Sequence, residues 1–389
     1  MIKYINGYLE YFNPLLLILG FILIMPDVIK QKFSLPKSSI IYIVFISLSL
    51  FMNFNILTAK QYLYEILYIG IIFYFAKNYL EEKEIKNIIK LVSVFCLICI
   101  IMIYFIHVVF PNQTIDNILF TNPNGGAALA LLCIVFVLQS KCYFKLLLLL
   151  SYLSYIYFSD SRAAMIIFFV LILYKLISTM KSNVSKAIKK IILISFIILS
   201  SIIGLYFYPV VINNTYSNID NTAFSIERKI GYISSERYYL WKYGFITVKE
   251  KNLFFGIGSN IGEQTINNYN EVFLNVLSPK QKDMMSRNNL HNGYMQILVT
   301  HGLLSLLIFL RILFDYNKKL NNTFVRGKEF LLFYLLINFF ENVFVLSNSV
   351  LVLIFWVIYG YLFENRTMSI EHDSYAMKTN LRKTFLFYS

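Results

Sequence analysis

The sequence predicts an all-α integral membrane protein: a polytopic bundle of about eleven (ten to twelve) transmembrane helices with one large, partly helical extracytoplasmic loop. Hydrophobic residues make up 58% of the 389 residues and charged residues only 14%, whereas a soluble domain carries about 25% charged residues. Apolar runs of about 20 residues recur along the chain, each long enough to cross roughly 30 Å of hydrocarbon. Because lipid offers no hydrogen-bond partners, such runs are expected to be helices.

The predicted spans follow these runs in chain order. They are roughly residues 11–29, 38–57, 62–79, 88–110, 123–139, 143–158, 162–180, 188–209, 291–313, 328–346 and 348–364. We therefore divide the chain into an N-terminal transmembrane bundle, 1–209, with about eight spans, a large extracytoplasmic loop, 210–290, a C-terminal bundle, 291–364, with about three spans, and a cytoplasmic tail, 365–389. The first span contains Pro14 and Pro26 and is expected to be a retained, kinked or partly re-entrant helix.

The positive charge reports topology rather than nucleic-acid binding. The net charge is +14, but Lys and Arg gather in every second short connection, for example at Lys30, Lys83 and Lys141, while the intervening connections hold almost none. Basic connections of membrane proteins face the cytoplasm. The pattern thus predicts a multi-pass protein of the cell inner (cytoplasmic) membrane with the loop 210–290, and the active site, on the extracytoplasmic face.

Nothing in the sequence indicates a metal or an organic cofactor. Cys96, Cys99, Cys133 and Cys142 lie in or beside apolar segments, and we interpret them as packed or lipid-facing thiols. The chain has no phosphate-binding P-loop, zinc-protease motif or nucleophile elbow, and no pair of acids in an outer loop that suits a divalent ion. We expect Arg and Lys to be the cations that meet any phosphate leaving group.

The outer loop contains a predicted helix over residues 235–250. Tyr239, Tyr243 and Ile246 fall on one helical stripe, Ser235 suits the N-cap, and Gly256-Ile257-Gly258 predicts a break in the chain. An aromatic helix of this kind either lies in the membrane interface or packs on other loop residues, and the sequence is consistent with both.

Two arginines lie where charge is costly, and such charges tend to be functional. Arg162 stands at the outer start of a predicted span, against the charge rule; the alternative is an Arg reaching the interface beside Asp160. Arg237, one turn from Trp241, suits bidentate phosphate binding; the alternative is a loop salt bridge with Glu227 or Glu236.

A histidine and an acid extend this set. His291 stands where the loop re-enters the membrane and suits proton transfer near neutral pH, unless it is a structural hydrogen-bonding residue. His301 and His107 are weaker candidates for catalysis. Glu341, in the tenth predicted span, could pair with an inward-facing Arg, mark a substrate groove or reach for water.

These residues resemble the motifs of the O-antigen ligase and polymerase superfamily. The resembling stretches are His291-Asn292 with Gly302 and Ser305 (a H-N-x9-G-x-x-G-type motif), Ser161-Arg162 (a Ser-Arg pair), Arg237 with Trp241 and Gly256-Ile257-Gly258 (R-x3-W…G-x-G), and Asn122-Pro123-Asn124-Gly125 (an Asn-rich turn). Ser305 departs from the family pattern and receives no role, and eleven spans are one fewer than the family commonly has.

The resemblance implies a glycosyltransferase that works without metal and inverts the anomeric centre. It implies that Arg162 and Arg237 bind the diphosphate of undecaprenyl diphosphate and that His291 orients or deprotonates the acceptor hydroxyl. The predicted substrate contacts are Asn292, Trp241, Arg287, Asn124 and Glu341. The implied partners are undecaprenyl-diphosphate-linked oligosaccharide as donor and acceptor, the lipid bilayer, and a flippase and chain-length regulators.

Four functions are consistent with these features. We favour a polymerase of a bacterial surface polysaccharide (capsule, exopolysaccharide or O-antigen), because the heavy use of Ile, Lys, Asn, Phe and Tyr is typical of AT-rich genomes with such gene clusters, which is an association only. The alternatives are a ligase that transfers glycan to another acceptor such as lipid A core, a polysaccharide or lipid-linked oligosaccharide transporter, and a non-catalytic assembly factor. Against the transporter, the chain shows no internal repeat.

Overall fold

The computed structural model describes residues 35–109, 123–139, 143–159, 161–179, 237–269, 274–275, 279–320, 328–343 and 350–363, with Gly20, Ile22, Met25 and Pro26. The predicted span 188–209, most of the span 11–29 and the tail 365–389 lie outside these residues. Every secondary-structure element in the described ranges is a helix.

The helices of the bundle coincide with predicted spans. They are α2 (Lys37–Met52), α3 (Ile56–Leu67) continuing through the π-helical turn η1 (Tyr68–Ile72) into α4 (Phe73–Tyr79), α5 (Glu82–Val109), α6 (Pro123–Gln139), α7 (Lys145–Phe158), α8 (Arg162–Thr179), α15 (Gly293–Lys319), α16 (Lys328–Phe340) and a last helix, Val350–Phe363. Within the part of the chain that the structure describes, two stretches, Lys83–Ile106 and Gly293–Lys319, are long and apolar enough to cross a membrane. The total number of spans therefore stays a prediction.

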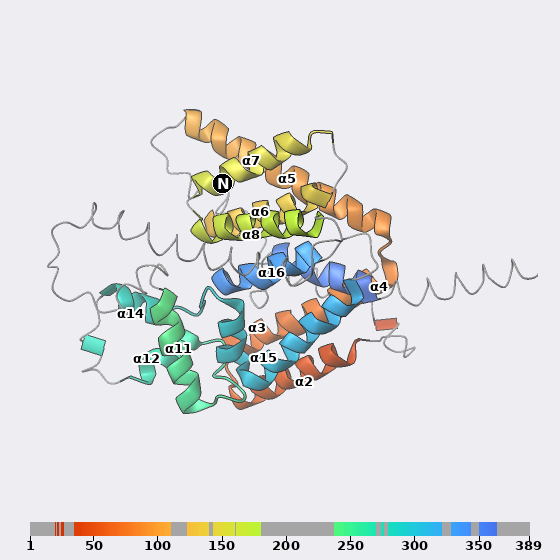
Figure 1. Cartoon of the computed structure of the whole chain (residues 1–389). Helices are drawn as coiled ribbons and strands as arrows, with labels where there is room; N and C mark the ends of the chain where they lie inside the picture. Colours follow the sequence, from red (N-terminus) through yellow and green to blue (C-terminus); the bar gives the residue numbers. More distant parts are fainter. Residues whose placement is uncertain are drawn as a thin grey trace, which may run out of the picture.

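The helix α16 joins two groups of helices (Figure 1). On one side it contacts α6 and α8, and α5 and α7 pack on the outside of this group. On its other side it contacts α15, which packs against α2. Three helices of the predicted outer loop, α11 (Arg237–Lys251), α12 (Ile261–Asn267) and α14 (Pro279–Met285), gather at one end of the bundle beside the start of α15.

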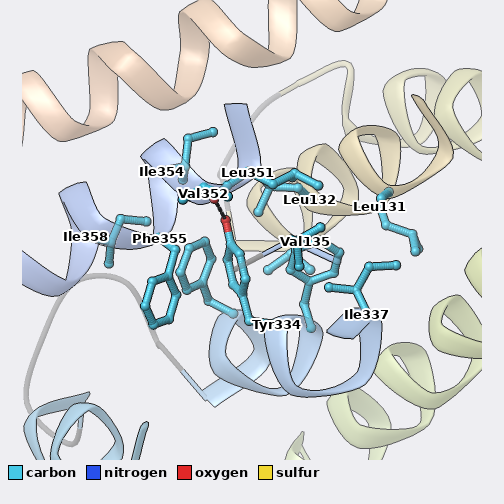
Figure 2. Packing of buried hydrophobic residues seen from close by; sticks show 14 of the residues in the cluster. Leu131, Leu132, Val135, Tyr334, Ile337, Leu351, Val352, Ile354, Phe355 and Ile358 are labelled. Carbon is cyan, nitrogen blue, oxygen red and sulfur yellow. Dashed lines mark hydrogen bonds between the residues drawn. The ribbon is translucent and has the colours of Figure 1, made fainter. Parts of the chain in front are cut away.

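The core around α16 is built from aromatic and branched side chains (Figure 2). Tyr334 of α16 is fully buried, and its hydroxyl donates a 2.6 Å hydrogen bond to the carbonyl of Leu351 in the last helix. By contrast, the outer helices expose large apolar side chains: Leu91 and Phe105 of α5 are 71% and 67% exposed, and Leu146 of α7 is 70% exposed. A soluble protein rarely exposes contiguous apolar surface of this kind, whereas lipid accepts it.

The loop helix α11 packs on protein rather than standing alone. Tyr239 and Tyr243, two residues of the predicted stripe, are buried and pack with Met285 of α14. Leu240 and Val248, on another side of α11, pack with Val299 of α15. The helix α11 thus packs on the bundle helix α15 as well as on other loop residues, which differs from packing on loop residues alone, and its placement in the membrane interface stays a prediction. The predicted N-cap Ser235 lies outside the described residues.

A break at Gly302 divides α15 into two helical segments. Gly302 has φ 86° and ψ 175°, a region that only glycine occupies readily. At the break the loop 253–258 replaces the missing helical hydrogen bonds. The amides of Ile257 and Gly258 donate to the carbonyls of Val299 and Thr300 at 2.9 and 3.1 Å. In return, the amides of Leu303 and Leu304 donate to the carbonyls of Leu253 and Phe254 at 2.9 and 3.4 Å.

We expect Gly302→Ala to be strongly destabilising, by roughly 3 kcal/mol or more. A Cβ at this position would lie 2.1 Å from the carbonyl oxygen of Phe254 and would also hold a positive φ. Gly70→Ala is the matched control, because a Cβ there meets nothing within 4 Å. Thermal unfolding of the two variants in detergent checks this, and equal melting temperatures would contradict it.

Candidate functional site

The predicted site residues lie at one end of the helix bundle. Helices α8 and α16 pack side by side, and Lys175 of α8 forms a 3.3 Å ion pair with Glu329 at the start of α16. Lys175 lies near the end of α8 and Glu329 at the start of α16, so the two helices can pack along their lengths only if they run antiparallel. Arg162 and Glu341 are then each about 20 Å from the ion pair, in the same direction, at 1.5 Å per residue.

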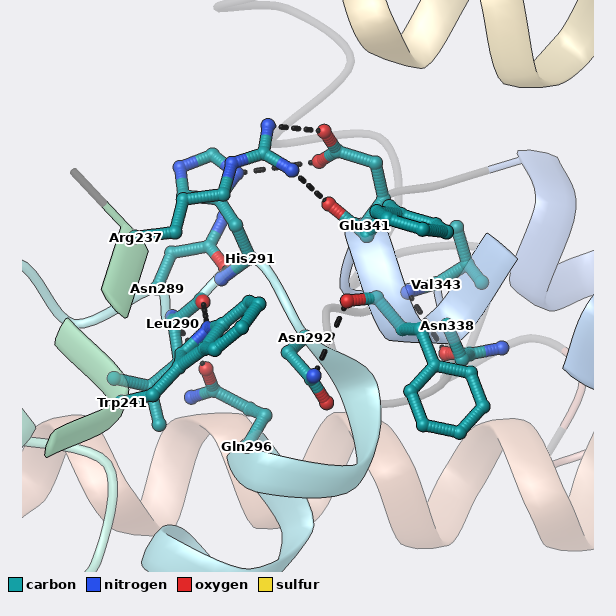
Figure 3. A network of polar contacts seen from close by, with 12 residues as sticks. Arg237, Trp241, Asn289, Leu290, His291, Asn292, Gln296, Asn338, Glu341 and Val343 are labelled. Carbon is teal, nitrogen blue, oxygen red and sulfur yellow. Dashed lines mark hydrogen bonds and ion pairs between the residues drawn. The ribbon is translucent and has the colours of Figure 1, made fainter. Parts of the chain in front are cut away.

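At this end three charged or titratable side chains meet (Figure 3). A terminal guanidinium nitrogen of Arg237, the first residue of α11, lies 2.8 Å from Oε1 of Glu341. The other terminal nitrogen donates to the carbonyl of Phe340. The second carboxylate oxygen, Oε2, lies 3.2 Å from Nδ1 of His291. Glu341 thus bridges Arg237 and His291, and all three side chains are at most one-fifth exposed.

His291 has an unusual backbone conformation. Its φ of 49° is the only positive φ of a non-glycine residue in the described part of the chain, and its amide donates to Oδ1 of Asn289 at 2.9 Å. Left-handed conformations cost a non-glycine residue roughly 1 kcal/mol and concentrate at functional sites. The preceding Leu290 is buried, and its carbonyl accepts a 2.8 Å hydrogen bond from Nε1 of Trp241. These contacts aim the imidazole at Glu341 (Figure 3).

Asn292 joins α15 to α16. Its Oδ1 accepts a 3.0 Å hydrogen bond from the amide of Met295, which makes it the N-cap of α15, and its Nδ2 donates to the carbonyl of Phe339 at 3.1 Å. Both ends of the amide thus serve the protein itself, and the side chain is buried. The contact with substrate predicted for Asn292 stays a prediction.

The comparisons with known proteins bear on this end of the bundle. Residues 146–310 match a protein-family model described as O-antigen ligase. Over this region, the chain is similar to the O-antigen ligase family. The matched region runs from α7 into α15 and contains Arg162, Arg237 and His291. A search of curated proteins found no match.

The match to the O-antigen ligase family model confirms the resemblance to the O-antigen ligase and polymerase superfamily found in the sequence. It supports a function of ligase or polymerase type, hence a glycosyltransferase-like reaction on a lipid-linked glycan at a membrane, and does not distinguish the two types. The described residues include no group of three His, Cys, Asp or Glu side chains placed to hold a metal ion.

Three of the predicted site residues lie outside the network in Figure 3. Arg162 is the exposed first residue of α8, and Asn124 lies in the first turn of α6. Since α7 runs back between them over short connections, α6 and α8 start at the same end of the bundle, the end that carries Glu341. Arg287 is exposed and forms a 2.6 Å ion pair with Asp283 of α14, its neighbour one turn away.

Sequence reasoning left one buried pair out. Nε2 of His301 lies 2.9 Å from Oε2 of Glu65 in α3, and the two side chains are 0% and 6% exposed. Glu65 is a charge within a predicted span, which is a signal that the rule on intramembrane charges recognises. His301 was considered only as a weaker candidate for catalysis. Neither residue contacts the network at Glu341.

Proposed function

We propose that the chain is a polymerase of a bacterial surface polysaccharide. It would transfer the growing glycan from undecaprenyl diphosphate onto the next lipid-linked repeat unit, at the outer face of the inner membrane. The observation that carries the proposal is the cluster of Arg237, Glu341 and His291 at the end of the bundle where Arg162 also lies. The match to the O-antigen ligase family model supports the reaction class.

In the proposed reaction His291 acts as general base. Because Nδ1 faces Glu341, Nε2 would take the proton of the acceptor hydroxyl, and the carboxylate would stabilise the resulting imidazolium. The acceptor oxygen attacks the anomeric carbon while the bond from that carbon to the diphosphate oxygen breaks. The diphosphate leaves with the bonding electron pair.

The leaving diphosphate gathers negative charge, and fixed cations in a partly dry site stabilise it. Arg237 and Arg162 would supply this charge. The N-terminal end of α15, with its positive helix dipole, begins directly after His291 and Asn292 and adds to it. In the structure described, the guanidinium of Arg237 forms an ion pair with Glu341. We propose that the diphosphate, when it binds, replaces part of this contact with the guanidinium.

The outer loop would contribute to sugar selection. Between α12 and α14 it forms a pocket of about 350 Å³. The pocket is lined by Ile266, Leu274, Asn275, Lys282 and Met285. Apolar walls with a few polar groups suit the mixed surface of a pyranose ring.

We expect Glu341→Gln to lower the turnover number by roughly 100-fold, because His291 would lose the charge that stabilises its protonated form. Glu329→Gln is the matched control: Glu329 is also buried and paired with a basic side chain, but at the opposite end of α16. The measurement is the rate of glycan transfer per folded molecule. Equal loss in both variants would contradict a specific role for Glu341.

Reconstitution tests the function itself. The purified protein in liposomes, given only lipid-linked repeat units, should yield a ladder of longer glycans on the carrier lipid. Product that appears only when lipid A core is added would instead identify a ligase, which the description of the matching family favours as the second candidate. If neither mixture gives a new glycosidic bond, the proposal is wrong, and transporter activity remains to be assayed.

A further inference from the structure

The buried pair of His301 and Glu65 is not used in the proposed reaction. Glu65 is held on both carboxylate oxygens, since Gln61 donates to Oε1 at 3.1 Å and His301 lies 2.9 Å from Oε2. The imidazole also packs against the ring of Tyr62, with 4.6 Å between the centroids. Burying two ionisable groups is unfavourable compared with apolar residues of similar size, so such pairs are weak evidence for stability.

The position of the pair in α15 points to its role. His301 directly precedes the break at Gly302. The direction of the segment 293–301 is therefore not set by the segment of α15 that follows the break. Contacts at its two ends fix it instead, and the hydrogen bonds from the loop 253–258 to Val299 and Thr300 are among them. At the N-terminal (upper) end of the segment, Asn292 hydrogen-bonds to α16. At the C-terminal (lower) end, His301 pairs with Glu65, and the carbonyl of Thr300 accepts a 3.0 Å hydrogen bond from the hydroxyl of Tyr62.

The upper end of this segment carries His291. Nine residues of helix span about 13 Å, so a tilt of about 5° at the lower end displaces the upper end by roughly 1 Å. A displacement of this size can lower a rate by about 100-fold. Glu65 lies near the end of α3, which continues directly into the π-helical turn η1. Such π-helical turns are frequent at functional sites.

We propose that His301 and Glu65 are positioning residues, which set the direction of the segment 293–301 and thereby hold His291 against Glu341. This inference rests on the proposed function, because it takes His291 to be the base. It assigns the pair no contact with substrate.

The test is the double variant Glu65→Leu/His301→Phe, which removes both polar groups together and leaves no buried charge unpaired. We expect a melting temperature close to wild type, a turnover number lowered about 10- to 100-fold and a KM for the lipid-linked donor within about twofold of wild type. Glu65→Gln should retain most activity, because it keeps the size and shape of the side chain that lies 2.9 Å from Nε2 of His301. Lys175→Leu/Glu329→Leu, which removes another partly buried ion pair, is the control and should keep full turnover.

A second measurement needs no substrate. The chain has two tryptophans, so Trp356→Phe leaves Trp241 alone, and Trp241 is hydrogen-bonded to Leu290 next to His291. In this background we expect the double variant to shift Trp241 emission to longer wavelength. If the wild-type protein showed no transfer activity but the double variant still showed this shift, the proposed function would be rejected and the positioning role would be supported. Wild-type turnover per folded molecule, or an unchanged emission spectrum, in the double variant would overturn the inference.

Discussion

Replacing Arg237 with Ala should lower glycan transfer by about 1,000-fold, the largest effect we expect from one side chain. Arg237 is the charged group that connects α11 to the end of α16, through Glu341 and the carbonyl of Phe340. In the proposed reaction it also faces the diphosphate. The variant loses the stabilisation of the leaving group and leaves Glu341 without its cation. The measurement is single-turnover transfer from the lipid-linked donor.

Two further variants separate charge from geometry. Arg237→Lys keeps the positive charge but cannot make both contacts of the planar guanidinium, so we expect an intermediate loss. Arg311→Ala is the control, since Arg311 is an exposed arginine that pairs with Asp315 one turn away on α15. Transfer at the wild-type rate by Arg237→Ala, at normal protein abundance, would refute the role of Arg237.

Replacing His291 should have the second-largest effect, a loss of about 500-fold in turnover, within the range that general-base catalysis contributes. The positive φ at His291 allows the chemistry of the ring to be separated from the conformation of the backbone. His291→Gly adopts φ 49° without strain, whereas His291→Ala carries a penalty of roughly 1 kcal/mol. We therefore expect His291→Gly to be more stable than His291→Ala and equally inactive.

Activity and thermal unfolding of both variants check this expectation. If His291→Gly retained transfer activity, residue 291 would be needed for its backbone conformation rather than for proton transfer. If the two variants unfolded at the same temperature, the backbone at His291 would not be strained in the way its φ implies.

The sequence predicted the helices well because hydropathy and spans depend on local composition. The described helices α5, α6 and α8 begin or end within several residues of the predicted spans 88–110, 123–139 and 162–180. The helix α11 was also predicted, since its aromatic stripe is a local pattern. Pairing was harder. Glu341 was expected to meet an inward-facing Arg, to face a substrate groove or to reach for water, and only the fold selects Arg237, which lies more than 100 residues earlier.

Two features of the candidate site lay beyond sequence reasoning for the same reason. The partners His301 and Glu65 come from separate spans, and nothing in the local pattern around either residue names the other. The glycines at 256, 258 and 302 were recognised as motif positions or as a break in the chain. That all three lie at one joint, where the loop 253–258 hydrogen-bonds to α15, follows only from the fold.

This joint limits how relatives of the chain can be recombined. The amides of Leu303 and Leu304 and the carbonyls of Val299 and Thr300 are paired with residues that belong to the outer loop in sequence. A chimera that receives a foreign outer loop without residues 253–258 would leave these four backbone groups to find other partners within the predicted span 291–313, where unpaired groups are heavily penalised. We therefore expect loop exchange between relatives to succeed only with grafts that leave residues 253–258 of the recipient in place, for example grafts that begin after Gly258 and carry the pocket lined by Ile266, Leu274 and Met285.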